Sequence, residues 1–231
     1  MNNTHISSAF DRDLEGIQTL LMKMGGLVEA AILDAARALE DRDTDLATQV
    51  RKGDQVVDAL EEQINADCAR LIALRAPTAT DLRTVLTVMK IAGNLERCGD
   101  YAKNLAKRTL VLAEGQPIGS SAGSIRRLAK TVQSLLRDAL DAFIRRDAAL
   151  AEDVRLRDQD VDQMYNALFR EFVTYMMEDS RNIGPMLHLH FIAKNIERVG
   201  DHATGIAEQV TYLVTGRMPN DDRPKAETPA A

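Results

Sequence analysis

The sequence contains an internal duplication. Residues 94–100 read Asn-Leu-Glu-Arg-Cys-Gly-Asp, and residues 195–201 read Asn-Ile-Glu-Arg-Val-Gly-Asp. Five of these seven positions are identical, and a sixth exchanges leucine for isoleucine. A chain that repeats itself at such a spacing is built from two copies of one structural unit. The fold must therefore place two similar units in one molecule.

The repetition extends upstream of this motif. Residues 54–58 (Asp-Gln-Val-Val-Asp) match residues 158–162 (Asp-Gln-Asp-Val-Asp), and residues 43–47 match residues 147–151, both 104 positions later. Residues 94–100 recur only 101 positions later, so the second copy lacks three residues between the two motifs. Connections tolerate such deletions best. In the first copy this region holds residues 75–78 (Arg-Ala-Pro-Thr), which predict a turn.

Composition favours helices and a cytoplasmic protein. Aromatic residues make up only 4% of the 231 residues, whereas the helix formers alanine, leucine, arginine and glutamate are abundant. No run of about 18 uncharged apolar residues suggests a membrane span, and the first residues do not resemble a signal peptide. Two cysteines, Cys68 and Cys98, make a poor disulfide framework. A net charge of −6 argues against nucleic acid as a partner.

Apolar residues spaced by three or four predict amphipathic helices throughout the chain. No long alternating pattern suggests a sheet, and the expected fold is all-α, with six long helices in two tandem three-helix bundles. The helices are expected at about 10–40, from a cap at Asp43 to about 74, from Thr78 or Thr80 onward in the first bundle, and at about 124–145, 147–178 and 183–215. The expected organisation is a first bundle at 1–114, a linker at 115–123, a second bundle at 124–216 and a disordered tail at 217–231.

Four pairs of acidic residues recur at matching places in the two copies. Members of each pair are four residues apart, so on a helix they share a face. Like charges at this spacing repel one another, and chance alone gives roughly five acidic pairs at it. The chain has seven such pairs. Four of the seven recur in both copies, and this recurrence is the signal. The recurring pairs are Asp54/Asp58, Glu96/Asp100, Asp158/Asp162 and Glu197/Asp201.

If the second and third helices of each copy are antiparallel neighbours, four carboxylates converge in each copy. Clustered carboxylates without cysteine or histidine are hard oxygen donors, which suit iron(III), Mn²⁺, Mg²⁺ or Ca²⁺ more than structural zinc. The competing interpretation is a solvated flank whose charge Arg97 and Arg198 neutralise.

A glycine stands three positions after each motif glutamate, at Gly99 and Gly200. Di-iron bundle enzymes carry a histidine at this spacing, so an oxygenase or ferroxidase is disfavoured. A glycine inside a helix costs about 1 kcal/mol relative to alanine. Its repetition predicts that another helix or an ion approaches closely at this point.

These motifs resemble the PhoU family of bacterial phosphate-signalling regulators. The resemblance rests on the two Glu-Arg-x-Gly-Asp motifs and on residues 71–77 followed by Asp81-Leu82-Arg83, and it covers roughly residues 10–215. It implies two three-helix bundles related by a pseudo-twofold axis. It also implies divalent or trivalent metal ions, as multinuclear iron in some members, at the eight residues of the four acidic pairs. Mn²⁺, Mg²⁺ and zinc stay open as alternatives.

The same resemblance implies a non-enzymatic regulator. Proteins of this family restrain phosphate uptake and phosphate-starvation signalling, as homodimers that bridge the transporter ATPase PstB and the sensor kinase PhoR. Contact with the membrane would then come only through these partners. Two alternatives remain from the residues alone, namely a carboxylate-bridged metalloenzyme or metal-storage bundle, and a purely structural helical protein. The second copy lacks the Arg-Ala-Pro turn, which leaves open whether the two metal sites are equivalent.

Overall fold

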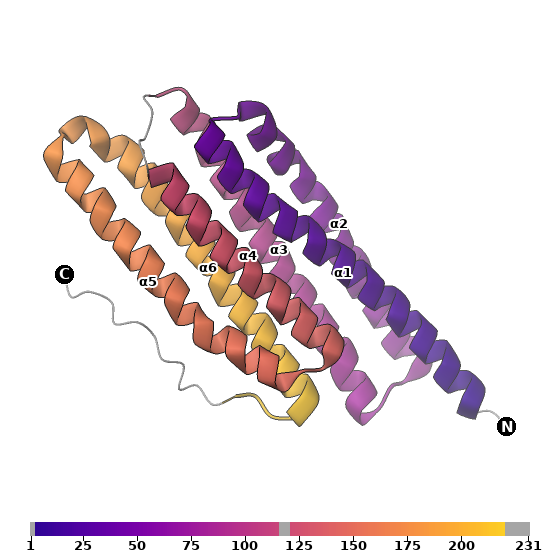
Figure 1. The fold of residues 1–231 in the computed structure, drawn as a ribbon. Coiled ribbons are helices and arrows are strands. Elements are labelled where there is room, and N and C mark those ends of the chain that lie inside the picture. Colours follow the sequence, from indigo (N-terminus) through magenta and orange to yellow (C-terminus); the bar gives the residue numbers. More distant parts are fainter. Residues whose placement is uncertain (1–2, 116–120, 220–231) are drawn as a thin grey trace.

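The computed structural model describes residues 3–115 and 121–219, and within them the protein is all-α with no strand (Figure 1). One short 3₁₀ helix, η1 (Ser180–Asn182), precedes the last long helix. The long helices are α1 (Asn3–Asp41), α2 (Thr44–Arg75), α3 (Ala79–Ala113), α4 (Ser121–Arg145), α5 (Ala148–Glu178) and α6 (Ile183–Thr215). The predicted fold class and six long helices are confirmed.

Equivalent aspartates begin the second helix of each copy. The Asp43 carboxylate accepts a hydrogen bond from the backbone N–H of Leu46 at 2.9 Å. The Asp147 carboxylate accepts from the backbone N–H groups of Ala149 and Leu150. These bonds satisfy amide groups that the first turn of a helix leaves without a partner. The repeated Asp43 and Asp147 therefore fix where α2 and α5 begin.

Three predicted boundaries differ from the structure or lie partly outside it. Helix α1 begins at Asn3 rather than at residue 10, and α4 begins at Ser121, inside the predicted linker at 115–123. The linker was predicted too long because its residues Ser121-Ala122-Gly123 are small and resemble a loop, although such residues are also tolerated in the first turn of a helix. Residues 116–120 of that linker, and residues 220–231 of the predicted tail, lie outside the described residues.

The two copies differ at the turn between their second and third helices. In the first copy α2 ends at Arg75, and the left-handed backbone of its cap residue Ala76 (φ 45°) turns the chain toward Pro77, which confirms the predicted turn. In the second copy α5 ends at Glu178, and the carboxylate of its cap residue Asp179 accepts a hydrogen bond from the Arg181 backbone N–H at the start of η1. The turn is thus built differently at the place where the copies differ in length.

The two copies pack side by side and share one apolar core. Helices α3 and α6 lie together in the centre, α1 lies beside α4, and α2 and α5 form the two outer edges (Figure 1). Buried apolar residues from all six long helices form one continuous cluster. The duplicated units therefore associate through their first and third helices and leave the outer faces of α2 and α5 to the surroundings.

Polar and glycine contacts set the fit between the copies. Across α3 and α6, a ring nitrogen of His202 lies 2.8 Å from the side-chain oxygen of Asn94. The imidazole also packs on Tyr101, with ring centroids 5.7 Å apart. Across α1 and α4, a Cβ on Gly25 would lie 2.5 Å from a methyl carbon of Leu140, so a larger residue here would require the Leu140 side chain to move.

Helix α1 is long and apolar enough, by length and composition, to pass a test for a membrane span over Ala9–Asp41. Its apolar positions, such as Leu21, Met24 and Val28, are nevertheless buried in the shared core. Core helices of bundles commonly have this composition. Packing against α2, α3 and α4 therefore accounts for its apolar residues.

Candidate metal centre on two acidic sets

The predicted site residues form two sets on neighbouring helices. The first acidic set is Asp54 and Asp58 of α2 with Glu96 and Asp100 of α3. The second acidic set is Asp158 and Asp162 of α5 with Glu197 and Asp201 of α6. Helices α2 and α3 are in contact along their length, as are α5 and α6. Each set therefore draws one pair from an outer helix and one pair from a central helix.

The carboxylates of each set are close enough to influence one another. Burial raises the pKa of the Glu96 carboxyl, and the nearby Asp100 and Asp58 raise it further against the opposing effect of Arg97. Burial likewise raises the pKa of the Glu197 carboxyl, with Lys194 opposing the rise and Asp201 and Asp162 adding to it. Ionising these glutamates costs free energy, which a bound cation would recover.

The repeated glycines of the motif lie where the aspartates of the outer helix approach. A Cβ on Gly99 would stand 3.3 Å from a carboxylate oxygen of Asp54, and one on Gly200 would stand 2.9 Å from a carboxylate oxygen of Asp158. Both aspartates are buried, at 5% and 3% exposure. The prediction of a close helix approach at these glycines is confirmed. Glycine here lets a buried carboxylate pack against the central helix.

Lysine 103 neutralises the first acidic set from within. Its ammonium nitrogen lies 2.5 Å from a carboxylate oxygen of Asp54 and 3.3 Å from one of Asp100, so it links α2 to its own helix. Burial raises the pKa of the Asp54 carboxyl, while the hydrogen bond from Lys103 lowers it and partly offsets this rise. The same bond raises the pKa of the Lys103 ammonium. A positive charge is thus already in place between the helices.

The second acidic set has no lysine at the corresponding position. Thr204 takes the place of Lys103, and its hydroxyl donates a hydrogen bond to the Gly200 carbonyl at 3.1 Å. Lys194, one helical turn before Glu197 in α6, donates a hydrogen bond to one carboxylate oxygen of Glu197 at 2.7 Å. The other oxygen, Oε2, is buried and has no hydrogen-bond partner among the residues that the structure describes. A buried acceptor without a donor is costly.

The surroundings of the sets differ in charge as well. A hollow of about 470 Å³ beside the first set is lined by the cations Arg51, Lys52 and Lys103 together with Asp54 and Asp58. In the second copy, leucine 156 stands where Lys52 does. Arg155, the counterpart of Arg51, is buried and pairs with Glu152 and Glu208. At these positions and at position 103, the first copy therefore has three lysine or arginine side chains, and the second copy has only Arg155.

Neither set is arranged as a closed metal site. Within residues 3–115 and 121–219, no three histidine, cysteine, aspartate or glutamate side chains are placed to hold a metal ion as they stand. Metal binding at either set requires the carboxylates to rotate toward a common point. Each set offers a buried carboxylate oxygen without a hydrogen-bond donor among the described residues, Asp54 Oδ1 in the first and Glu197 Oε2 in the second.

Comparison with known proteins agrees with the duplicated helical architecture. The family model described as "PhoU domain" matches twice, over residues 21–109 and 125–210, one match in each copy. The chain belongs to the PhoU family. The two matches also divide the chain at the place where α3 ends and α4 begins.

Relatives in this family match over almost the whole chain. The "Phosphate-specific transport system accessory protein PhoU homolog" of Caulobacter vibrioides is 44% identical over 223 residues, 96% of this chain and 97% of the relative. The protein of the same description from Rhizobium meliloti is 44% identical over 225 residues, 97% of this chain and 95% of the relative.

Solved structures of the family have the same fold. The crystal structure of PhoU from Pseudomonas aeruginosa superposes with a TM-score of 0.87 at 42% identity, covering 90% of this chain and all of that one. The phosphate transport system regulatory protein PhoU from Streptococcus pneumoniae gives 0.84 at 31% identity, covering 91% and 99%.

Three side chains at or beside the acidic sets were not predicted from the sequence, namely Lys103, Lys194 and Thr204. Lys103 follows Asp100 by three residues, the spacing of a helical ion pair, and this signal was available. Its reach across to Asp54 depends on how closely α2 and α3 approach, which spacing along one helix does not show. The contrast with Thr204 becomes informative only once Lys103 is seen between the two helices.

Proposed function

We propose that this protein restrains phosphate uptake and phosphate-starvation signalling as an accessory protein of a phosphate transport system. The observation that carries the proposal is its similarity, at 44% identity over nearly its full length, to relatives described as phosphate-specific transport system accessory proteins. Similarity across both copies supports a role that uses the whole duplicated bundle. The protein is then a cytoplasmic regulator that acts by binding, and it catalyses no reaction.

The proposed binding partners are the transporter ATPase PstB and the sensor kinase PhoR, with this protein as a homodimeric adaptor between them. The outer faces of α2 and α5 support an adaptor role because they are related by the duplication and lie on opposite edges of the molecule (Figure 1). Purification of the tagged protein from its own cells should recover both partners. Recovery of neither, from membranes solubilised in mild detergent, would contradict the adaptor role.

Metal binding is the proposed chemistry of the acidic sets, and the two sets differ in how well they fit a cation. In the first set the Lys103 ammonium already bridges Asp54 and Asp100. In the second set a buried oxygen of Glu197 has no donor, and Asp201 and Asp162 repel its charge. A divalent or trivalent ion would neutralise this set and tie α5 to α6. Its oxygen donors suit iron, Mn²⁺ or Mg²⁺.

The proposal predicts that Lys103→Thr makes the first acidic set bind metal as the second does. Titration calorimetry with Mn²⁺, together with elemental analysis, should show more bound metal in Lys103→Thr than in the wild type. Glu197→Ala should lose the wild-type binding. Lys107→Thr is the matched control, since it removes a lysine one turn farther along α3. Equal metal content in the wild type, Lys103→Thr and Glu197→Ala would contradict metal binding at these sets.

The regulatory role is tested separately in cells. Deletion of the gene should raise alkaline phosphatase expression and phosphate uptake in phosphate-rich medium, because restraint is lost. A plasmid copy of the wild type should restore the low level. Unchanged expression in the deletion strain would refute the regulatory role. Oxidation of Fe²⁺ with turnover, abolished by Glu96→Ala, would instead favour the metalloenzyme alternative.

A further inference from the structure

An arginine links the first two helices of the second copy. The guanidinium of Arg157 in α5 lies 2.5 Å from a carboxylate oxygen of Asp138 in α4 and 2.9 Å from one of Asp153 in its own helix. The Nη2 group of Arg157 donates a charge-assisted hydrogen bond to Asp138, while its Nε makes only an ion-pair contact with Asp153. Arg157 therefore ties α5 to α4.

The first copy keeps one carboxylate but lacks the arginine. At 104 positions earlier, Asp138 corresponds to Asp34, Asp153 to Gln49, and Arg157 to Gly53. A Cβ built on Gly53 meets no heavy atom within 4 Å, so the space that an arginine would use is open.

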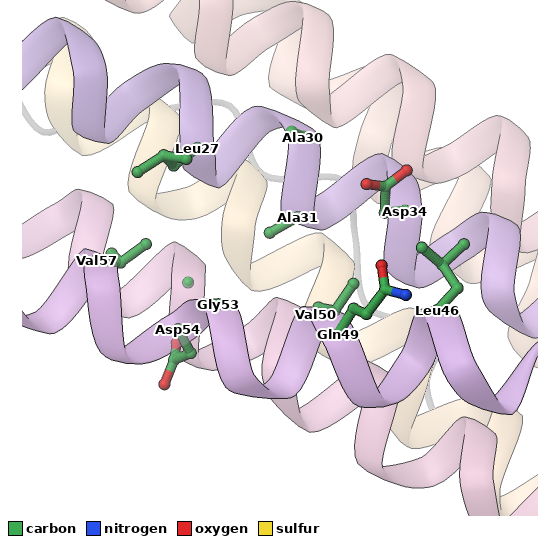
Figure 2. A pocket seen from close by; sticks show the side chains of 11 residues that line it. Leu27, Ala30, Ala31, Asp34, Leu46, Gln49, Val50, Gly53, Asp54 and Val57 are labelled. Carbon is green, nitrogen blue, oxygen red and sulfur yellow. The ribbon is translucent and has the colours of Figure 1, made fainter.

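A cavity of about 180 Å³ lies at this place, between α1 and α2. Figure 2 shows Gly53 on its floor, with Asp34 of α1 standing across from Gln49 of α2. The walls between them are apolar and include Leu27, Ala31, Leu46, Val50 and Val57. The side chain of Asp54 points away from α1 and pairs with Lys103, so this residue of the first acidic set also borders the cavity.

The chemistry of this cavity matches an arginine side chain. Three methylene groups of an arginine bury well along apolar walls, while its guanidinium keeps polar partners. Asp34 and Gln49 supply a carboxylate and an amide oxygen as acceptors. Asp34 currently pairs with Arg37 of its own helix at 3.2 Å, and both side chains are at least 40% exposed. Such a surface pair contributes little and is easily exchanged.

We propose that this cavity binds an arginine side chain presented by a partner protein. The arginine takes the position that Arg157 occupies in the second copy, with its guanidinium on Asp34 and its stem against Val50 and Leu27. The duplication supplies the evidence, because the same backbone holds an arginine in one copy and an open space with the matching carboxylate in the other. This inference does not depend on metal binding or on the regulatory role.

The test uses n-butylguanidinium as the probe, on the full chain, followed by methyl NMR. The methyl resonances of Leu27, Leu46, Val50 and Val57 should shift and saturate, with a Kd of about 1 mM as expected for so small a ligand. Gly53→Arg should weaken binding by about tenfold or more, since its own side chain then fills the cavity and a charge-assisted contact is lost. n-Butanol and n-butylammonium should bind more weakly than the probe.

Two further variants keep the test decisive. Asp34→Asn removes the carboxylate at an exposed position and should weaken probe binding even if Gly53→Arg disturbs the fold. Gly26→Arg adds an arginine on α1 where a Cβ likewise meets nothing within 4 Å, and should leave binding unchanged. Absence of saturable shifts, equal binding of n-butanol, or binding unaffected by Asp34→Asn would each overturn the proposal.

Discussion

Replacing Gly200 by alanine should destabilise the protein even though alanine is the better helix former. The change removes a backbone cost of about 1 kcal/mol that glycine carries inside a helix. It also adds a methyl group 2.9 Å from a carboxylate oxygen of Asp158 and 3.3 Å from a methyl carbon of Val161. Asp158 is only 3% exposed, so its carboxylate has little room to move away.

Three glycines allow the steric effect to be separated from helix propensity. Overpacking a buried contact costs about 1–3 kcal/mol, so Gly200→Ala should lower the free energy of unfolding by about 0–2 kcal/mol net. At Gly99 the nearest atoms are 3.2–3.3 Å away, and the two effects should roughly cancel. At Gly93, in the same helix as Gly99, a Cβ meets nothing within 4 Å. Gly93→Ala should therefore stabilise by about 1 kcal/mol.

Urea unfolding followed by circular dichroism measures this series, with thermal melting as a second measurement. The expected order of stability is Gly93→Ala, then Gly99→Ala, then Gly200→Ala. For a chain of this size, each 1 kcal/mol corresponds to about 2–4 °C in Tm. If Gly200→Ala stabilises as much as Gly93→Ala, the close approach of α5 to α6 has no energetic consequence. The physical account of the repeated glycine would then be wrong.

Two further substitutions test burial and the fit between the copies. Burial raises the pKa of the Glu29 carboxyl, with the hydrogen bond from Gln133 opposing the rise. The folded state therefore holds this proton more tightly, and stability falls as the pH rises from the usual carboxyl pKa through the raised one. Glu29→Gln should accordingly raise the free energy of unfolding more near pH 7 than near pH 4 in urea titrations; an equal effect at both would contradict this. For Asn94 and His202, a double-mutant cycle to alanine should give a coupling of about 1 kcal/mol, and strict additivity would show that their hydrogen bond contributes nothing.

The fold was predictable because the sequence pattern of an amphipathic helix is local, with apolar residues spaced by three or four positions. The apolar spacing located all six long helices, and Asp43 located the start of the second. The duplication then predicted that the two halves would be built alike. Boundaries were less certain, because Ser121-Ala122-Gly123 suits both a loop and a first helical turn. The choice between these depends on whether the segment packs, as the buried Ser121 and Ala122 do.

The way the halves associate was not predictable from the chain. The two bundles could be separate units joined by a linker, or they could share one core. Both arrangements use the same helices with the same apolar stripes. Gly25 and Gly205 carried a signal, since each lies where the other copy approaches, at Leu140 and Asn94. A glycine in a helix shows that something comes close, but it does not identify the neighbour. Only the packed structure distinguishes contacts within a copy, as at Gly99, from contacts between copies.

Differences between the copies are more informative about function than the features they share. The eight carboxylates and two glycines are repeated, so they describe what the ancestral unit already had. Lys103 against Thr204 and Gly53 against Arg157 are changes at equivalent positions of one backbone. The first change places a fixed positive charge in one acidic set, and the second opens a cavity beside a carboxylate. The surroundings of α2 in the first copy and of α5 in the second therefore present different chemistry to whatever the molecule binds.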